Sequence, residues 1–99
     1  DTVFCHTEEM ALGAIASLKN AGLEGITVLG IDGQKAAVQK IVDGEIAAVS
    51  TCDTQNGELI YSMIAAYFNG ENLTKETTIP SEIIDSKNAA DALTNGMAF

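Results

Sequence analysis

The chain contains no arginine, and its five lysines face 14 acidic residues, so its formal net charge is −9 at pH 7. Such an acidic surface repels phosphate backbones, which disfavours nucleic-acid binding. No apolar run approaches the ~20 residues that a membrane-spanning helix needs. Nothing resembles a signal peptide, and the first residue is not methionine. We therefore expect a fragment or a processed product.

Cysteine and histidine are also scarce. We expect the strands of Cys5 and Cys52 to lie two strand spacings apart, roughly 10 Å, which exceeds the ~7 Å between Cα atoms that a disulfide allows. Two free thiols that behave as small buried hydrophobes are the expectation. His6 is the only histidine, and it points to the opposite strand face from Cys5, so the pair forms neither a metal site nor a nucleophilic dyad. The sequence thus predicts no metal, no cofactor and no enzyme.

The alternation of apolar runs and amphipathic stretches predicts an α/β fold. Its 99 residues correspond to about one small domain. Alternating strands and helices imply right-handed βαβ units and a parallel sheet with flanking helices. The predicted strands are Thr2–His6, Ile26–Ile31, Ile46–Thr51 and Glu82–Asp85. The predicted helices are one capped by Thr7 with Lys19 in its last turn, then Gln34–Asp43, Leu59–Phe68, and a short one after a cap at Asp85 or Ser86.

Three polar residues end successive strands of this predicted sheet: Thr7, Asp32 and Thr51. In open α/β sheets the carboxyl edge is where ligands bind. Asp32 is the strongest candidate, because Gly33 allows close backbone approach and a carboxylate accepts hydrogen bonds from two adjacent hydroxyls of a polyol. The alternative is a turn aspartate that caps the next helix.

The other polar groups near this edge have ordinary structural explanations. Thr7 fits the N-cap of the first helix, a role compatible with ligand contact. The hydroxyl of Thr51 can be satisfied locally within its strand. Glu8 and Glu9 diverge by ~100° on the first helical turn, where the helix dipole favours anions, so we expect two solvated carboxylates and no acid–base pair.

Three strings resemble the C-terminal part of type I periplasmic sugar-binding proteins, the ribose/galactose group of ABC-transporter receptors. The family pattern N-D-x-M-A-x-G-A corresponds to Thr7–Ala14, and V-x-G-x-D-G corresponds to Val28–Gly33. A looser match to A-I-x-x-G-x-I-A-A-x-V covers Gln39–Val49. Their order and spacing extend the resemblance over essentially the whole chain.

The resemblance implies a sugar or polyol site. The family's Asn, Asp and Asn or Gln ligands correspond to Thr7, Asp32, and Thr51 or its neighbour Cys52. Asp32 matches in type, whereas both amide positions carry other residues here. The ligand-binding residues expected from the resemblance are therefore Thr7, Asp32 and Thr51.

The resemblance also implies a two-lobed fold that closes on its ligand at a hinge. Residues 1–52 would end the C-terminal lobe, 53–80 would carry a hinge-crossing helix that packs on the N-terminal lobe, and 81–99 would supply a returning strand and terminal helix. The expected partners are a sugar or polyol, an ABC transporter permease and the missing N-terminal lobe. Self-association of the fragment is expected because its strand edge is exposed. The location implied is extracytoplasmic, in the periplasm or as a cell-surface lipoprotein.

A second function shares this fold: the effector-binding domain of a LacI-type transcription regulator. Such regulators usually carry Pro-Leu-Thr-Thr before the third strand, where this chain has Gly44–Ala48, and a second acidic or amide residue where it has Gly33. Both positions favour the receptor. A small doubly wound enzyme is disfavoured because no cofactor loop or nucleophile–base pair is present.

Overall fold

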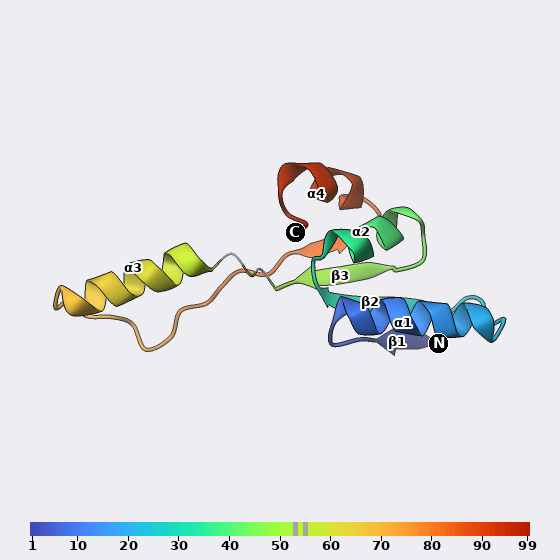
Figure 1. Ribbon diagram of the computed structural model, residues 1–99, viewed down its shortest axis with the longest axis horizontal. Coiled ribbons are helices and arrows are strands. Elements are labelled where there is room, and N and C mark those ends of the chain that lie inside the picture. Colours follow the sequence, from blue (N-terminus) through green and yellow to red (C-terminus); the bar gives the residue numbers. More distant parts are fainter. Residues whose placement is uncertain (53, 55) are drawn as a thin grey trace.

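The computed structural model describes residues 1–52, 54 and 56–99; Asp53 and Gln55, at the start of the predicted 53–80 segment, lie outside the described residues. Strands and helices alternate along the described chain, as the sequence predicts (Figure 1). In chain order they are β1 (Thr2–Phe4), α1 (Glu8–Asn20), β2 (Thr27–Asp32), α2 (Lys35–Val42), β3 (Ala48–Thr51), α3 (Gly57–Phe68), β4 (Ile83–Asp85) and α4 (Ala89–Asn95).

The described strands form one sheet in the order β1-β2-β3-β4. The first three are parallel, which confirms the α/β fold with its parallel core. The prediction that every strand is parallel is wrong for β4, which pairs antiparallel with β3. The chain leaves β3 at its carboxyl end and returns through α3 to that same end, so β4 runs back in the opposite direction (Figure 1).

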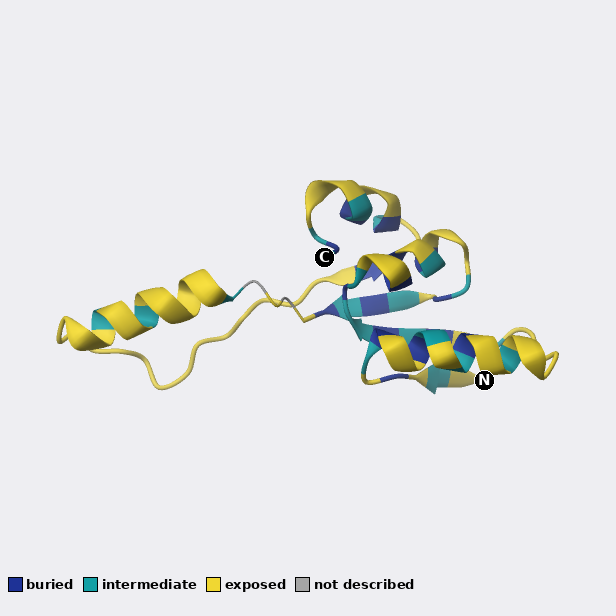
Figure 2. Ribbon diagram, in the orientation of Figure 1, coloured by how far each residue is buried: buried dark blue, intermediate teal, exposed yellow. Residues whose placement is uncertain are grey.

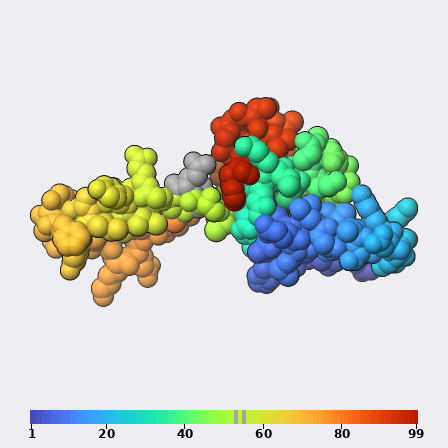
Figure 3. Space-filling view, in the orientation of Figure 1, coloured from blue at the N-terminus to red at the C-terminus, as the bar shows by residue number. Residues whose placement is uncertain are grey.

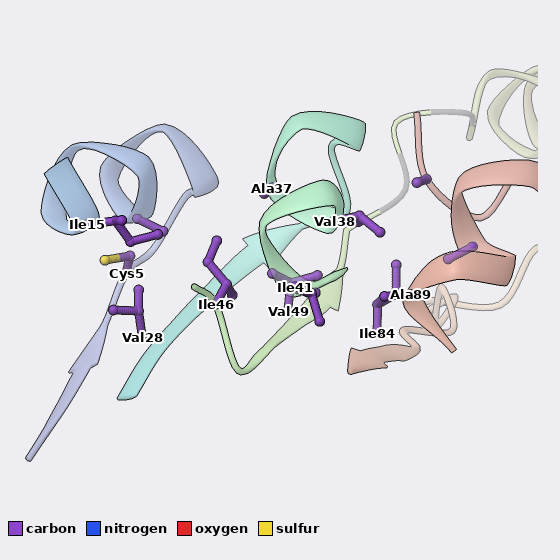
Figure 4. Packing of buried hydrophobic residues seen from close by; sticks show 13 residues of the cluster. Cys5, Ile15, Val28, Ala37, Val38, Ile41, Ile46, Val49, Ile84 and Ala89 are labelled. Atoms are coloured by element: carbon purple, nitrogen blue, oxygen red, sulfur yellow. The ribbon is translucent and has the colours of Figure 1, made fainter. Parts of the chain in front are cut away.

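The hydrophobic core lies between the sheet and the helices on one of its faces. Because strand side chains alternate between faces, Val28, Val49 and Ile84 point the same way and are buried. Figure 4 shows the helix residues Ile15 and Ile41 reaching down onto this layer. Two successive right-handed connections in the same direction along the sheet place α1 and α2 on the same face.

The opposite face of the sheet carries apolar side chains that no described element covers. Phe4 is 55% exposed and Ile83 is 58% exposed, while Leu29 and Ile31 between them are half-buried. Sheets with parallel strands normally have both faces covered. We refer to these four residues as the bare sheet face.

The helix α3 stands away from the sheet. It forms as predicted, but none of its residues is buried, and Figure 2 shows it exposed over most of its length. The described chain accordingly measures 60 × 25 × 16 Å, and Figure 3 shows α3 as a separate projection. The large apolar residues exposed on it are Leu59, Ile60, Tyr61, Ile64, Tyr67 and Phe68. Even so, α3, like every other helix in the described ranges, lacks the length and apolar content needed to cross a membrane.

A local sequence signal explains the start of α1 but not that of α4. Thr7 caps α1, as predicted, by accepting the N–H of Met10 at 3.4 Å. The predicted cap of α4 at Asp85 or Ser86 is wrong, because that helix begins at Ala89 with Asn88 at its N-cap. Asp85 instead accepts the N–H of Lys87 at 2.8 Å in the turn before the helix.

Candidate ligand-binding site

The parallel strands bring the predicted site residues to one edge of the sheet. Asp32 and Thr51 are register partners at the ends of β2 and β3. Thr7 lies between β1 and α1 at the same edge, since β1 is parallel to β2. The Cys52 N–H donates to the Asp32 carbonyl at 2.9 Å and ties the two strand ends together. Successive strand ends thus meet here, as the sequence predicts.

Asp32 has an unusual backbone conformation, and its side chain has no partner in the described part of the chain. Its φ is 132°, and it is the one non-glycine residue with positive φ among the described residues. Such a conformation costs ~1–3 kcal/mol and is typical of functional sites. No group of the described residues hydrogen-bonds to its carboxylate. The alternative that Asp32 caps α2 is not realised, because Gln34 holds the N-cap position and that end has no side-chain cap. As far as the described residues go, the Asp32 carboxylate therefore keeps its capacity to accept hydrogen bonds.

Glu8 contradicts the expectation of a solvated first turn. Its side chain is fully buried beneath the loop that follows β2. One carboxylate oxygen, Oε1, accepts the Gly33 N–H at 2.8 Å, and Oε2 accepts the Gln34 N–H at 2.6 Å. The first helical residue points under the sheet edge because the β1–α1 turn is short, and a glycine in β2 leaves room for it. Sequence reasoning missed this contact, for which the weak signals were Gly30 and Gly33.

The pKa values of the two neighbouring glutamates are shifted in opposite directions. Burial raises the pKa of Glu8 above its ordinary value of 4.5, and the nearby charges of Asp32 and Glu9 add to this, although the hydrogen bonds from Gly33 and Gln34 oppose it. The exposed Glu9 accepts a hydrogen bond from the Gln34 side-chain amide, which lowers its pKa. An adjacent pair of carboxylates thus has two distinct environments.

The Thr51 hydroxyl is used inside the protein. Thr51 is 8% exposed, and its Oγ1 accepts the Glu82 N–H at 2.8 Å. The next residue, Cys52, is exposed beside Asp32. Both cysteines are free, in line with the expectation, but only Cys5 is buried as expected. The ligand role of Thr51 remains a prediction, and the Cys52 alternative offers the more accessible side chain.

A depression of about 390 Å³ lies beside Thr51 on the α4 side of the sheet edge, and neither Thr7 nor Asp32 lines it. Its lining residues are Thr51, Pro80, Glu82, Asn95, Gly96 and Met97. Of the three predicted ligand residues, the depression therefore includes Thr51 alone. In the described part of the chain, no cluster of His, Cys, Asp and Glu has the arrangement of a metal site.

Similarity to known proteins defines the class: the chain is homologous to the sugar-binding receptors of ABC transporters and has their α/β fold. It is 33% identical to the fructose import binding protein FruE of Bifidobacterium longum over 94 residues, 94% of this chain and 29% of that protein. It is 31% identical to the ribose import binding protein RbsB of Bacillus subtilis over 86 residues, 86% of this chain and 28% of that protein.

A solved structure of a sugar-binding protein has the same fold as this chain. The periplasmic binding protein component of the arabinose ABC transporter from Shewanella sp. ANA-3, bound to α- and β-L-arabinofuranose, matches with a TM-score of 0.86 at 25% identity. The match covers 97% of this chain and 34% of that one. No protein-family model matches the sequence. The chain thus spans about a third of the length of the proteins it resembles.

Proposed function

We propose that this chain forms the sheet edge and hinge segment of an extracytoplasmic receptor that binds a sugar or polyol and delivers it to an ABC transporter permease. The observation that carries the proposal is the Asp32 carboxylate. It has no hydrogen-bond partner among the described residues, it stands at the carboxyl edge of parallel strands, and its residue has a strained backbone conformation. Such a carboxylate can accept hydrogen bonds from two neighbouring hydroxyls of a sugar. Each charge-assisted hydrogen bond stabilises the complex by ~1.5–3 kcal/mol.

Thr7 and the end of β3 complete the proposed site. The Thr7 hydroxyl is already occupied with the N–H of Met10 and with the Glu9 carboxylate, so it serves as a secondary contact. At the end of β3, the buried Thr51 offers its remaining hydrogen-bonding capacity, while the exposed Cys52 offers contact area. The lack of an amide at either position suggests fewer hydrogen bonds from this lobe than in receptors that carry one.

Two uncovered apolar surfaces support the proposal that further lobes belong to the receptor. Residues 1–52 would form the end of the C-terminal lobe, and the rest of that lobe would cover the bare sheet face. The exposed α3, within residues 53–80, would pack on an N-terminal lobe, and residues 81–99 would return the chain to the first lobe. Both surfaces are apolar enough to require a partner. The location would be extracytoplasmic, in the periplasm or on a lipoprotein anchor.

Two other functions fit less well. The relatives named above are import binding proteins, which favours a receptor over a transcription regulator of the LacI type. They are also binding proteins and not enzymes. The acidic net charge of −9 argues against a nucleic-acid partner for this segment.

The test is isothermal titration of the intact receptor with D-ribose, D-fructose, L-arabinose and myo-inositol. We expect one of these probes to bind the wild type. Asp32→Asn should then weaken that binding roughly 100-fold or more, because two charge-assisted hydrogen bonds are lost. Asparagine tolerates positive φ, so the substitution leaves the backbone in place.

The matched control is Glu24→Gln, which removes one exposed carboxylate in the loop before β2, at the opposite edge of the sheet. Its affinity should stay within about twofold of the wild type, because charges that are far apart and exposed are largely screened. If Asp32→Asn leaves the ligand affinity unchanged, the receptor does not bind its ligand at this edge.

A further inference from the structure

Glu8 lies directly beneath the Asp32 loop, although its own side chain is fully buried and out of reach of a ligand. It accepts the Gly33 N–H at 2.8 Å and the Gln34 N–H at 2.6 Å, one on each carboxylate oxygen. These are the two N–H groups that follow Asp32 in the chain. Glu8 therefore fixes the peptide units that determine where the Asp32 side chain points.

The conformation of Asp32 requires such support. With φ at 132°, Asp32 is in a region that residues other than glycine occupy only where the surroundings hold them. On one side, the Cys52 N–H donates to the Asp32 carbonyl at 2.9 Å. On the other side, Glu8 holds the next two peptide units. Asp32 is thus fixed from both neighbouring strand ends.

The fold is built to accommodate the Glu8 carboxylate. A Cβ placed on Gly30 would lie 3.3 Å from Glu8 Cγ, so the missing side chain of Gly30 leaves room for it. Glu8 is the first residue of α1, where the helix dipole favours a negative charge. Within the described residues no lysine forms an ion pair with it. Two backbone N–H groups therefore compensate its charge.

We propose that Glu8 is a positioning residue for ligand binding, whose ionised carboxylate holds the Asp32 loop in the geometry that accepts sugar hydroxyls. This role depends on the proposed receptor function. An ionised carboxylate accepts on both oxygens, whereas a protonated one carries a donor on one of them. Protonation would leave the N–H of Gly33 or Gln34 without its acceptor. The titratable groups that face Glu8 are Asp32, at the end of β2, and Glu9, on α1.

The experiment compares Glu8→Gln with the matched control Glu9→Gln in the intact receptor. Both variants remove one carboxylate from the same helical turn, but Glu9 bonds to the side chains of Gln34 and Thr7 and not to the backbone of the loop after β2. Each is titrated with D-ribose, D-fructose, L-arabinose and myo-inositol at pH 7 and pH 5. At pH 7 we expect Glu8→Gln to bind roughly tenfold more weakly, the effect of one buried hydrogen bond, and Glu9→Gln to bind within about twofold of the wild type.

The pH profile separates positioning from a merely structural role. Wild-type affinity should fall between pH 7 and pH 5, and that of Glu8→Gln should fall less, because glutamine does not titrate. Should Glu8→Gln fail to fold, Glu8→Asp keeps the charge but is one methylene too short to reach both N–H groups, so it should bind more weakly while retaining the pH dependence.

Each outcome decides between the two proposals. If the wild type binds a sugar and Glu8→Gln or Glu8→Asp binds it with the same affinity, the role of Glu8 is overturned and the receptor function is retained. Weaker binding of Glu8→Gln with a pH profile identical to that of the wild type also overturns it, because Glu8 then acts through overall structure alone. A folded wild type that binds none of the four probes overturns the receptor function and this role together.

Discussion

Thr51 and Glu82 exchange two hydrogen bonds where the chain leaves and re-enters the sheet. The Thr51 N–H donates to the Glu82 carbonyl at 2.8 Å, and the Glu82 N–H donates to Thr51 Oγ1 at 2.8 Å. The hydroxyl therefore joins the outgoing and returning segments of the chain.

We predict that Thr51→Val lowers the free energy of unfolding of the receptor by about 1 kcal/mol, because the Glu82 N–H loses its side-chain acceptor. Ligand affinity should fall less than with Asp32→Asn. Urea unfolding and titration calorimetry measure the two effects. The control is Thr27→Val, whose exposed hydroxyl has no hydrogen bond among the described residues and whose loss should leave stability within about 0.5 kcal/mol. A larger loss of affinity than with Asp32→Asn would identify Thr51 as the main ligand contact.

Glu8 should make stability depend on pH in a defined direction. Its pKa is raised in the folded state, mainly by burial, so the folded protein binds this proton more tightly than the unfolded chain does. The resulting contribution to stability is complete below the ordinary value of 4.5 and is lost as pH rises through the raised pKa. Wild type should therefore gain stability relative to Glu8→Gln as pH falls from 7 to 4.

Urea unfolding of both proteins across that pH range measures the difference between their free energies of unfolding. The contributions of the other carboxylates are the same in both proteins and cancel in this difference. This trend is opposite to that expected for ligand affinity, which should fall with pH in the wild type. A wild type that instead loses stability relative to Glu8→Gln as pH falls would show that burial does not dominate the pKa shift of Glu8.

Cys52 provides a chemical probe of the site. Its side chain is exposed beside Asp32, whereas Cys5 is 4% exposed in the core. Iodoacetamide should modify Cys52 in the folded receptor and reach Cys5 only after unfolding. Saturating sugar should slow the modification of Cys52 several-fold, as followed by mass spectrometry of the two cysteine peptides. Equal rates with and without bound sugar would place the ligand away from the end of β3.

The 99-residue chain by itself should associate in solution. Its bare sheet face and α3 expose large apolar side chains, including Phe4, Ile64 and Phe68, and uncovered surfaces of this kind favour association. Light scattering with size-exclusion chromatography should report a mass above that of the monomer, which is 10.3 kDa. Replacing Ile64 and Phe68 with glutamate should reduce the association, whereas the same change at exposed Ser62 and Ala65 should not. A monomer at all concentrations would contradict this expectation.

Patterns local to the sequence were enough to predict much of the fold. Alternating strand and helix periodicity predicted the order of elements, because each element depends mainly on which of its side chains are apolar. The direction of β4 was not predictable in this way. It depends on where α3 returns the chain, and nothing within Ile83–Asp85 encodes that path.

The same division applies to the candidate site. The sequence by itself determined that Asp32 ends a buried strand at the carboxyl edge of the sheet, because strand order and parallel direction follow from the alternation of elements. Only the tertiary structure decided that Glu8 turns inward beneath it and that the Thr51 hydroxyl turns to Glu82. Those contacts join residues 25 and 31 positions apart, so their partners become neighbours only when the sheet has formed.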